Sequence, residues 1–157
     1  MRGGGGVKNQ ALFTSNKSTW ETPQKLFNEL DREFHFTIDV ASNNNNHKCQ
    51  RYYTEEDNGL SKNWQGETVF CNPPYGNIET GVWTKKCYEE SLKPNTTVVL
   101  LIPARTDRKS FHDYIYKKPS VEIRFIKGRL KFEINGLPKN SSTFPSMIVV
   151  FGERETR

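Results

Sequence analysis

Residues 68–75 have the sequence TVFCNPPY, a short apolar run followed at once by two prolines. The β-branched and aromatic residues at its start favour a buried strand. Proline fixes its own φ and keeps the preceding residue out of the helical region, so Asn72 and Pro73 are expected to be extended. Open α/β sheets bind their ligands just beyond the carboxyl ends of their strands. The loop Asn72-Pro73-Pro74-Tyr75 is therefore the first candidate for a functional site.

This loop carries the groups needed to hold an exocyclic amino group. Such a group has two N–H donors and a lone pair delocalised into its ring, so it is a weak nucleophile until acceptors bind both hydrogens. The Asn72 side-chain oxygen and the Pro73 carbonyl can accept them and stabilise the positive charge that develops on nitrogen. Pro74 stiffens the loop, and Tyr75 offers a face on which a flipped base can stack. The simpler alternative is that the prolines only end a strand and that Tyr75 fills a gap in the core.

The sequence before the loop predicts one helix and one strand. Thr22-Pro23 is typical of a helix start, and the apolar residues that follow it recur at helical spacing, which predicts a helix over about residues 23–33. Apolar residues then alternate with polar ones from Phe34 to Ile38. This alternation predicts a strand that ends near Asp39.

The sequence after the loop predicts two more helices and three more strands. One helix is expected to bury Val82, Trp83, Cys87 and Leu92. A second helix is expected around Phe111, Tyr114 and Ile115. The strands are expected at residues 96–102, 121–126 and 147–151, the last two forming a candidate antiparallel pair on either side of Asn135-Gly136.

The order of these elements predicts the fold class. Two strands joined by a helix imply a parallel crossover, and the apolar run at residues 96–102 is typical of a strand covered on both faces. We therefore expect an α/β fold with a single, mostly parallel sheet, helices on both faces and an antiparallel C-terminal strand. The 157 residues fit one domain, with a flexible Gly-rich arm over residues 1–15 and the folded domain over residues 16–157.

Composition limits the partners. The net charge of +5 weakly favours a polyanionic partner. No apolar run approaches the roughly 20 residues that span a bilayer, and the N-terminus lacks the apolar core of a signal peptide, so we expect a cytoplasmic protein with no membrane partner. Three cysteines and three histidines are scattered without the spacing of a metal site, and no metal is expected.

Several further motifs occur in a fixed order around the loop. With it, they resemble the phage DNA N6-adenine methyltransferases of the Dam type, over residues 20 to 151. The motifs are Trp20-x-Thr22-Pro23, Asp39-Val40-Ala41-Ser42, Tyr52-Tyr53-Thr54 with Asn58-Gly59-Leu60, Leu101-Ile102-Pro103-Ala104-Arg105-Thr106-Asp107, and Gly128-Arg129-Leu130-Lys131-Phe132. The ordered series is more specific than any one of its members.

The resemblance implies a Rossmann-like methyltransferase domain that binds S-adenosyl-L-methionine. This cofactor has a sulfonium, an α-amino group, a carboxylate and an adenosine, so its site needs acids and backbone donors in one cleft. Asp39 is the best candidate acid, for the methionine or ribose portion, beside Ala41; Asp57 is a weaker candidate for the adenine amino group. Thr22 and Pro23 resemble the Thr-Pro element that contacts the methionine end in related enzymes, although an ordinary helix start has the same sequence.

One feature departs from the pattern of such enzymes. The Gly-rich turn usual after the first strand is replaced by Ser42 and Asn43. We therefore expect either a different backbone approach to the cofactor or a lower affinity for it.

The resemblance also implies DNA as the partner. Arg105, Arg129 and Lys131 offer positive charge for phosphates, with Phe132 beside the last of them. The alternatives that stay open are methylation of a protein glutamine or of an RNA base, because the loop suits those substrates too. A third alternative is a non-catalytic relic of the fold that only binds DNA or a host protein.

Overall fold

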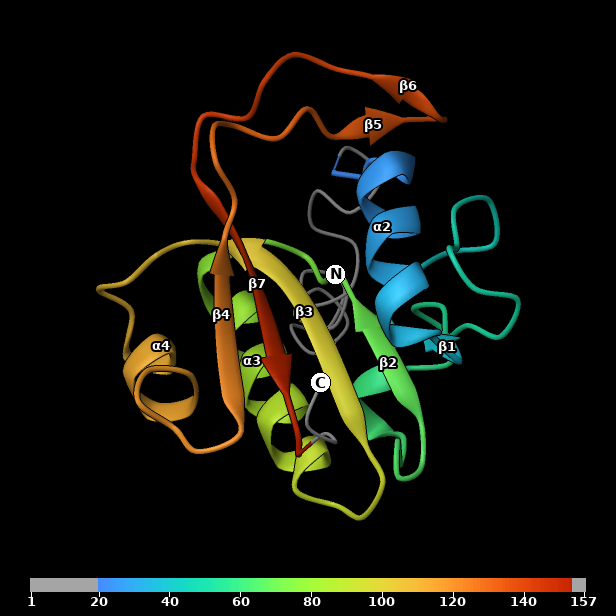
Figure 1. Cartoon of the computed structure of the whole chain (residues 1–157). Coiled ribbons are helices and arrows are strands. Elements are labelled where there is room, and N and C mark those ends of the chain that lie inside the picture. Colours follow the sequence, from blue (N-terminus) through green and yellow to red (C-terminus); the bar gives the residue numbers. More distant parts are fainter. Residues whose placement is uncertain (1–19, 154–157) are drawn as a thin grey trace, which may run out of the picture.

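The computed structural model describes residues 20–153, and the predicted arm over residues 1–15 lies outside them. A five-stranded sheet forms the centre, in the order β1-β2-β3-β7-β4 (Figure 1). Strands β1, β2 and β3 are parallel, whereas β7 is antiparallel to both β3 and β4. The predicted mostly parallel sheet with an antiparallel C-terminal strand is confirmed. The strands are β1 Ile38–Asp39, β2 Thr68–Cys71, β3 Thr97–Pro103, β4 Val121–Phe125 and β7 Ser146–Phe151.

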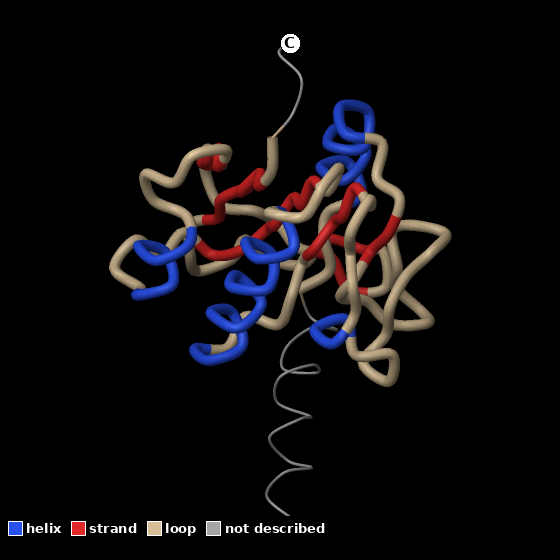
Figure 2. The backbone as a smooth tube through the Cα atoms, turned by 90° about the horizontal axis from the view of Figure 1, so that it is seen from below, coloured by secondary structure: helices blue, strands red, loops and turns tan. Residues whose placement is uncertain are grey.

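Helices cover both faces of this sheet, as predicted (Figure 2). Helices α3 (Asn77–Ser91) and α4 (Lys109–Tyr114), with the short 3-10 helix η2 (Gly59–Ser61), cover one face, where Trp83, Phe111 and other apolar side chains pack. Helix α2 (Gln24–Phe34) covers the other face through Phe27 and Leu30. Successive residues of β3 alternate between these two apolar clusters, so the strand is buried on both sides.

The strand predicted from Phe34 to Ile38 is shorter than expected. Helix α2 continues through Phe34 and ends at His35, which has a left-handed backbone with φ of 58°. Only Ile38 and Asp39 pair with β2. The alternating pattern arises because Phe34 and Phe36 stack on each other and pack in the cluster around α2. A helix end followed by a left-handed residue therefore produced the period of two that is typical of a strand.

Only half of the apolar residues that were expected to be buried on α3 are buried. Trp83 and Cys87 are buried, but Val82 and Leu92 are 39% and 67% exposed. Their places in the interior are taken by polar residues, among them Glu90. The Glu90 carboxylate accepts hydrogen bonds from the Trp64 backbone N–H and from Lys86 and Lys93. A buried carboxylate is tolerated here because each of its oxygens has charged or backbone partners.

Asn135-Gly136 forms a turn, but not between β4 and β7. The two residues have φ of 53° and 81° and close a separate hairpin of β5 (Glu133–Ile134) and β6 (Leu137–Pro138). Strands β4 and β7 do pair antiparallel, as predicted, and the hairpin lies in the long connection between them. None of the helices in the described part of the chain is long and apolar enough to cross a membrane.

We expect Glu90→Gln to lower the free energy of unfolding by about 1–3 kcal/mol at pH 7. Although burial alone would raise the pKa of Glu90, hydrogen bonds from Lys93 and the Trp64 amide lower it below its usual value. The folded-state pKa thus lies below that of the unfolded chain, so the stabilisation is complete above about pH 4.3 and is lost as the pH falls through the folded-state pKa. Urea unfolding at pH 7 and at pH 3 measures both effects. The exposed neighbour Glu89 gives the control Glu89→Gln, and equal losses from the two variants would contradict the prediction.

Candidate active site

The Asn-Pro-Pro-Tyr loop lies at the carboxyl edge of the sheet. Asn72 directly follows β2, while the neighbouring strands β1 and β3 end at Asp39 and Pro103. Because β1, β2 and β3 are parallel, these three ends lie at the same edge. Asn72, Pro73 and Pro74 are buried, so their backbone is packed into the domain.

The Asn72 side chain is held in one orientation. Its Nδ2 donates to the Trp20 carbonyl and to Thr22 Oγ1, both at 2.9 Å. A carbonyl oxygen can only accept a hydrogen bond, so the amide nitrogen must face Trp20 and the amide oxygen must face the opposite way. The buried Thr22 hydroxyl accepts this hydrogen bond from Asn72, and the expected contact of Thr22 with the cofactor stays a prediction. The adjacent Pro23 is the N-cap residue of α2.

Tyr75 lies against the other end of the same amide. Its hydroxyl is 2.5 Å from Asn72 Oδ1 and 3.1 Å from the Leu101 carbonyl oxygen. The ring packs among Trp20, Phe132 and Phe144, with centroid separations of 5.8 to 6.4 Å. Burial raises the pKa of Tyr75 well above its usual value, so the phenol stays protonated. In this arrangement the ring fills the core, and stacking on a base stays a prediction that requires the ring to turn outward.

A small cavity opens between the ends of β1 and β2. It is lined by residues that follow β1, by Thr54 and Glu55, by Pro74 of the loop and by Trp83 of α3; the residues after β1 are Val40, Ala41 and Ser42. Ala41 and Pro74 are therefore brought together, as expected of a cofactor site beside the loop. Burial, with a contribution from the Glu56 charge, raises the pKa of Glu55 above its usual value. Glu55 was not anticipated from the sequence, although its place two residues after the Tyr-Tyr motif could have indicated it.

The two aspartates expected at the cofactor both close local turns. Asp39 is 3% exposed, and its oxygens accept hydrogen bonds from the backbone N–H groups of Ala41 and Lys48. Asp57 is exposed and accepts hydrogen bonds from the backbone N–H and hydroxyl of Thr54, which lower its pKa. Asp39 thus shapes the chain that borders the cavity, whereas Asp57 does not line it.

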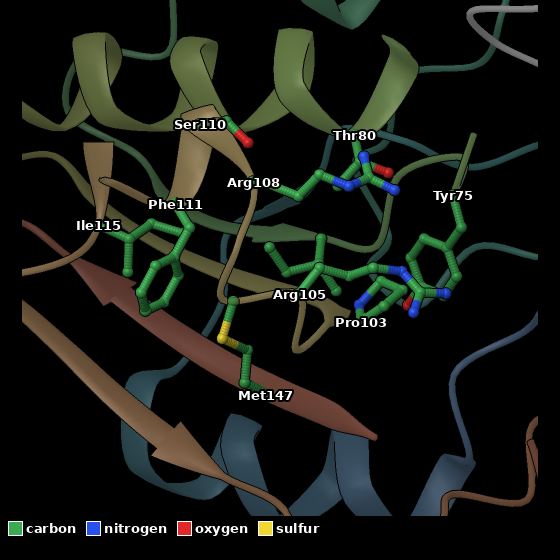
Figure 3. A pocket seen from close by; sticks show the side chains of 10 residues that line it. Tyr75, Thr80, Pro103, Arg105, Arg108, Ser110, Phe111, Ile115 and Met147 are labelled. Carbon is green, nitrogen blue, oxygen red and sulfur yellow. The ribbon is translucent and has the colours of Figure 1, made fainter. Parts of the chain in front are cut away.

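A second cavity lies beyond the end of β3, between Tyr75 and helix α4. Figure 3 shows Arg105 and Arg108 extending toward the Tyr75 end of this cavity. The Arg105 guanidinium also lies over the Phe144 ring, 5.6 Å from its centroid. Arg108 was not anticipated; it donates hydrogen bonds to the carbonyl and side-chain oxygens of Asn77 at the start of α3. Its position just after a strand of the same sheet edge is the signal that could have found it.

Arg129 and Lys131 lie apart from these cavities. Both are exposed, on the chain that leads from β4 into the β5–β6 hairpin. The structure therefore brings together Thr22, Asn72 and Tyr75, and separately Ala41 and Pro74, while the expected DNA contacts are spread along the same edge.

Comparison with known proteins assigns the chain to a family. The family model described as DNA N-6-adenine-methyltransferase (Dam) matches residues 9–157. The chain belongs to this family. This Dam-family chain is 29% identical over 141 residues to the DNA N-6-adenine-methyltransferase of Haemophilus phage HP1, an overlap covering 87% of this chain and 80% of the relative.

A relative with the same description comes from Escherichia phage T1. It is 26% identical over 122 residues, which cover 76% of the Dam-family chain and 49% of the relative. The chain thus spans about half the length of that protein.

Thr22→Val tests the role of the Asn72 contact. The substitution keeps the shape of the side chain but removes the hydroxyl, so the Asn72 amide nitrogen keeps only the Trp20 carbonyl as an acceptor and is held less firmly. We expect the single-turnover methyl-transfer rate to fall about 10- to 100-fold, as for other small misplacements of a reacting group. Affinity for S-adenosylhomocysteine, measured by calorimetry, should stay within twofold.

Thr22→Ser is the matched control, because it keeps the hydroxyl and should keep most of the rate. If Thr22→Val loses cofactor affinity in proportion to its rate, Thr22 acts by binding the cofactor and not by orienting Asn72.

Proposed function

We propose that the chain transfers the methyl group of S-adenosyl-L-methionine to N6 of adenine in DNA. The observation that carries the proposal is the fixed Asn72 amide at the end of β2. Its nitrogen is held by Trp20 and Thr22, so its oxygen faces the opposite way, where it now accepts a hydrogen bond from the Tyr75 hydroxyl. Membership of the Dam family supports adenine and DNA as the substrate.

The chain's own residues act on the amino group. Asn72 Oδ1 and the Pro73 carbonyl accept its two hydrogens and hold the nitrogen in place. As positive charge develops on that nitrogen, these fixed dipoles stabilise the transition state more than the ground state. Because Tyr75 is now bound to Asn72 Oδ1, its hydroxyl shares or yields that oxygen when the substrate binds. Its ring then turns from the aromatic cluster toward the base.

The cavity between β1 and β2 fits the cofactor in its chemistry. Val40, Pro74 and Trp83 are apolar residues at this cavity, and Glu55 is the acid that lines it, suited to ribose hydroxyls or an α-amino group; at about 10 Å³ the cavity must widen to admit an adenine ring. When bound, the cofactor supplies an electrophilic methyl group. Asp39 contributes indirectly by holding the turn at Ala41. The mostly parallel sheet with its antiparallel β7 supports a Rossmann-like methyltransferase domain as part of this proposal.

DNA binds along the carboxyl edge of the sheet. The ion pairs formed within residues 20–153 include none of Arg105, Arg108, Arg129 and Lys131, so no carboxylate in this part of the chain neutralises their charge, although Arg108 is hydrogen-bonded to Asn77. A duplex cannot present adenine N6 to a buried loop, so the target base must leave the stack. Arg105 and Arg108 beside Tyr75 are placed to hold the backbone of the extruded nucleotide.

Asn72→Ala is expected to lower the methyl-transfer rate about 100-fold or more, because one preorganised acceptor is lost. Cofactor affinity should remain within a few-fold. The measurement is single-turnover transfer of labelled methyl groups to unmethylated DNA, followed by digestion to nucleosides. N6-methyladenine is the expected product.

Each other outcome identifies an alternative. N4-methylcytosine would change the base, label in RNA or protein would change the substrate, and no transfer despite DNA binding would indicate a non-catalytic relic.

Glu55→Gln should weaken the binding of S-adenosylhomocysteine about tenfold, since a charged acceptor is replaced by a neutral one. Calorimetry with the pure protein measures the affinity without DNA. Glu56→Gln, a change of the same kind on the exposed neighbour, should leave the affinity unchanged. Equal affinities of all three proteins would remove Glu55 from the cofactor site.

A further inference from the structure

The connection between β4 and β7 forms a distinct element at the active-site edge. Strand β4 runs parallel to β3, because both are antiparallel to β7, so β4 ends and β7 begins at the edge where the Asn-Pro-Pro-Tyr loop lies. The connecting residues 126–145 leave the sheet there and carry the β5–β6 hairpin, which Figure 1 shows beyond that edge, near the start of α2. The φ values of Asn135 and Gly136 are both positive, as in the tight turns that match the twist of a hairpin.

This hairpin is fixed to the active site. Glu21 and Glu133 exchange two backbone hydrogen bonds, at 3.2 and 2.9 Å, so β5 is paired with the residue just before Thr22. The backbone N–H of Gly136, at the turn, donates to the buried Glu21 carboxylate. Phe132, at the root of the hairpin, is fully buried beside Tyr75. The tip therefore has a defined position relative to Asn72.

The tip itself is apolar and uncovered. Ile134 and Leu137 are opposite each other in the β5–β6 ladder, so their side chains lie on the same face. They are 38% and 70% exposed. Two adjacent apolar side chains on a rigid, projecting turn form a small wedge rather than scattered surface residues.

The chain leading to this tip is positively charged. Lys127, Arg129 and Lys131 are exposed, and the ion pairs of the described residues include none of them. Elsewhere several cations are neutralised, as in the pairs of Arg51 with Glu67 and Arg124 with Glu33. A partner that satisfies both features must present closely spaced negative charges beside flat apolar surfaces. Duplex DNA has phosphates beside stacked bases.

We propose that the β5–β6 hairpin is the DNA-recognition element of this chain. Ile134 and Leu137 pack against the bases next to the target adenine, and Lys127, Arg129 and Lys131 hold the adjacent phosphates. Apolar wedges of this kind partly unstack neighbouring bases, which lowers the cost of moving the target base into the loop. The assignment rests on the proposed function and adds to it the element that binds the target DNA and helps to extrude the target base.

DNA binding tests the hairpin without requiring catalysis. Fluorescence anisotropy with a labelled 30-base-pair duplex compares the parent with the double variant Ile134→Ser, Leu137→Ser. We expect about tenfold weaker binding, with an unchanged dependence on salt, because apolar contacts are lost and phosphate contacts are kept. Arg129→Ala should instead reduce the slope of log affinity against log salt by about one. Leu92→Ser, which changes a leucine of similar exposure at the far end of α3, should bind like the parent.

A methylation assay distinguishes a hairpin that helps to extrude the target base from one that only contacts the DNA. The duplex is built around a position that the parent methylates, with the target adenine either paired or opposite an abasic site. The double variant should methylate the paired target about tenfold more slowly than the parent, and the abasic site should restore most of its rate.

The outcomes are distinct. If the parent binds DNA but transfers no methyl group, the proposed function fails and the binding comparison still judges the hairpin. If the double variant and Leu92→Ser both bind and methylate like the parent, the hairpin is not the recognition element.

Discussion

The hydrogen bonds from the Asn72 amide to the Trp20 carbonyl and the Thr22 hydroxyl join parts of the chain that are 52 and 50 residues apart. Leaving a buried amide without these acceptors would cost about 1–3 kcal/mol, so the contact fixes where the start of α2 meets the end of β2. The position of Trp20 in the aromatic cluster follows from it, as does the pairing of Glu21 with the hairpin. The orientation of the Asn72 oxygen and the architecture around the loop therefore depend on the same pair of bonds.

The aromatic cluster beside this amide holds Tyr75 with its hydroxyl against Asn72, and the proposed function requires that ring to turn outward. With Tyr75 packed against Phe132 and Phe144, the interior is filled and the Asn72 oxygen has a donor. An incoming amino group can replace that donor, so the hydrogen-bond count is conserved when the tyrosine turns outward. The elevated pKa of Tyr75 keeps its hydroxyl a donor in the packed arrangement. Under the proposed function, substrate binding would exchange one hydrogen-bond donor to the Asn72 oxygen for another, so this buried oxygen would keep a partner.

Sequence patterns predicted those parts of the fold that depend on the backbone preferences of neighbouring residues. Strand β2 was predicted correctly because a run of β-branched and aromatic residues ended by two prolines restricts the backbone by itself. The strand at Phe34 was overestimated because a left-handed residue after a helix imitates alternation. The partner of Thr22 could not be inferred, since it depends on a residue 50 positions away. Asp39 and Asp57 accept hydrogen bonds from backbone N–H groups that lie at most nine residues away. These bonds compete with a ligand for the carboxylate oxygens, and no sequence motif indicated them.

Topology explains why recognition and chemistry occupy one edge. An antiparallel strand inserted between β3 and β4 obliges the chain to leave and re-enter the sheet at the carboxyl edge, where the loop already lies. A connection placed there can lengthen at a small entropic cost, because loop closure depends only weakly on length. Its anchors are at the buried Phe132 and at Glu133, which pairs with Glu21, whereas the Ile134 and Leu137 side chains at its tip are 38% and 70% exposed. Substitutions at Ile134 and Leu137 can therefore alter which DNA is bound while the Asn72 geometry stays the same, which lets target choice change independently of methyl transfer.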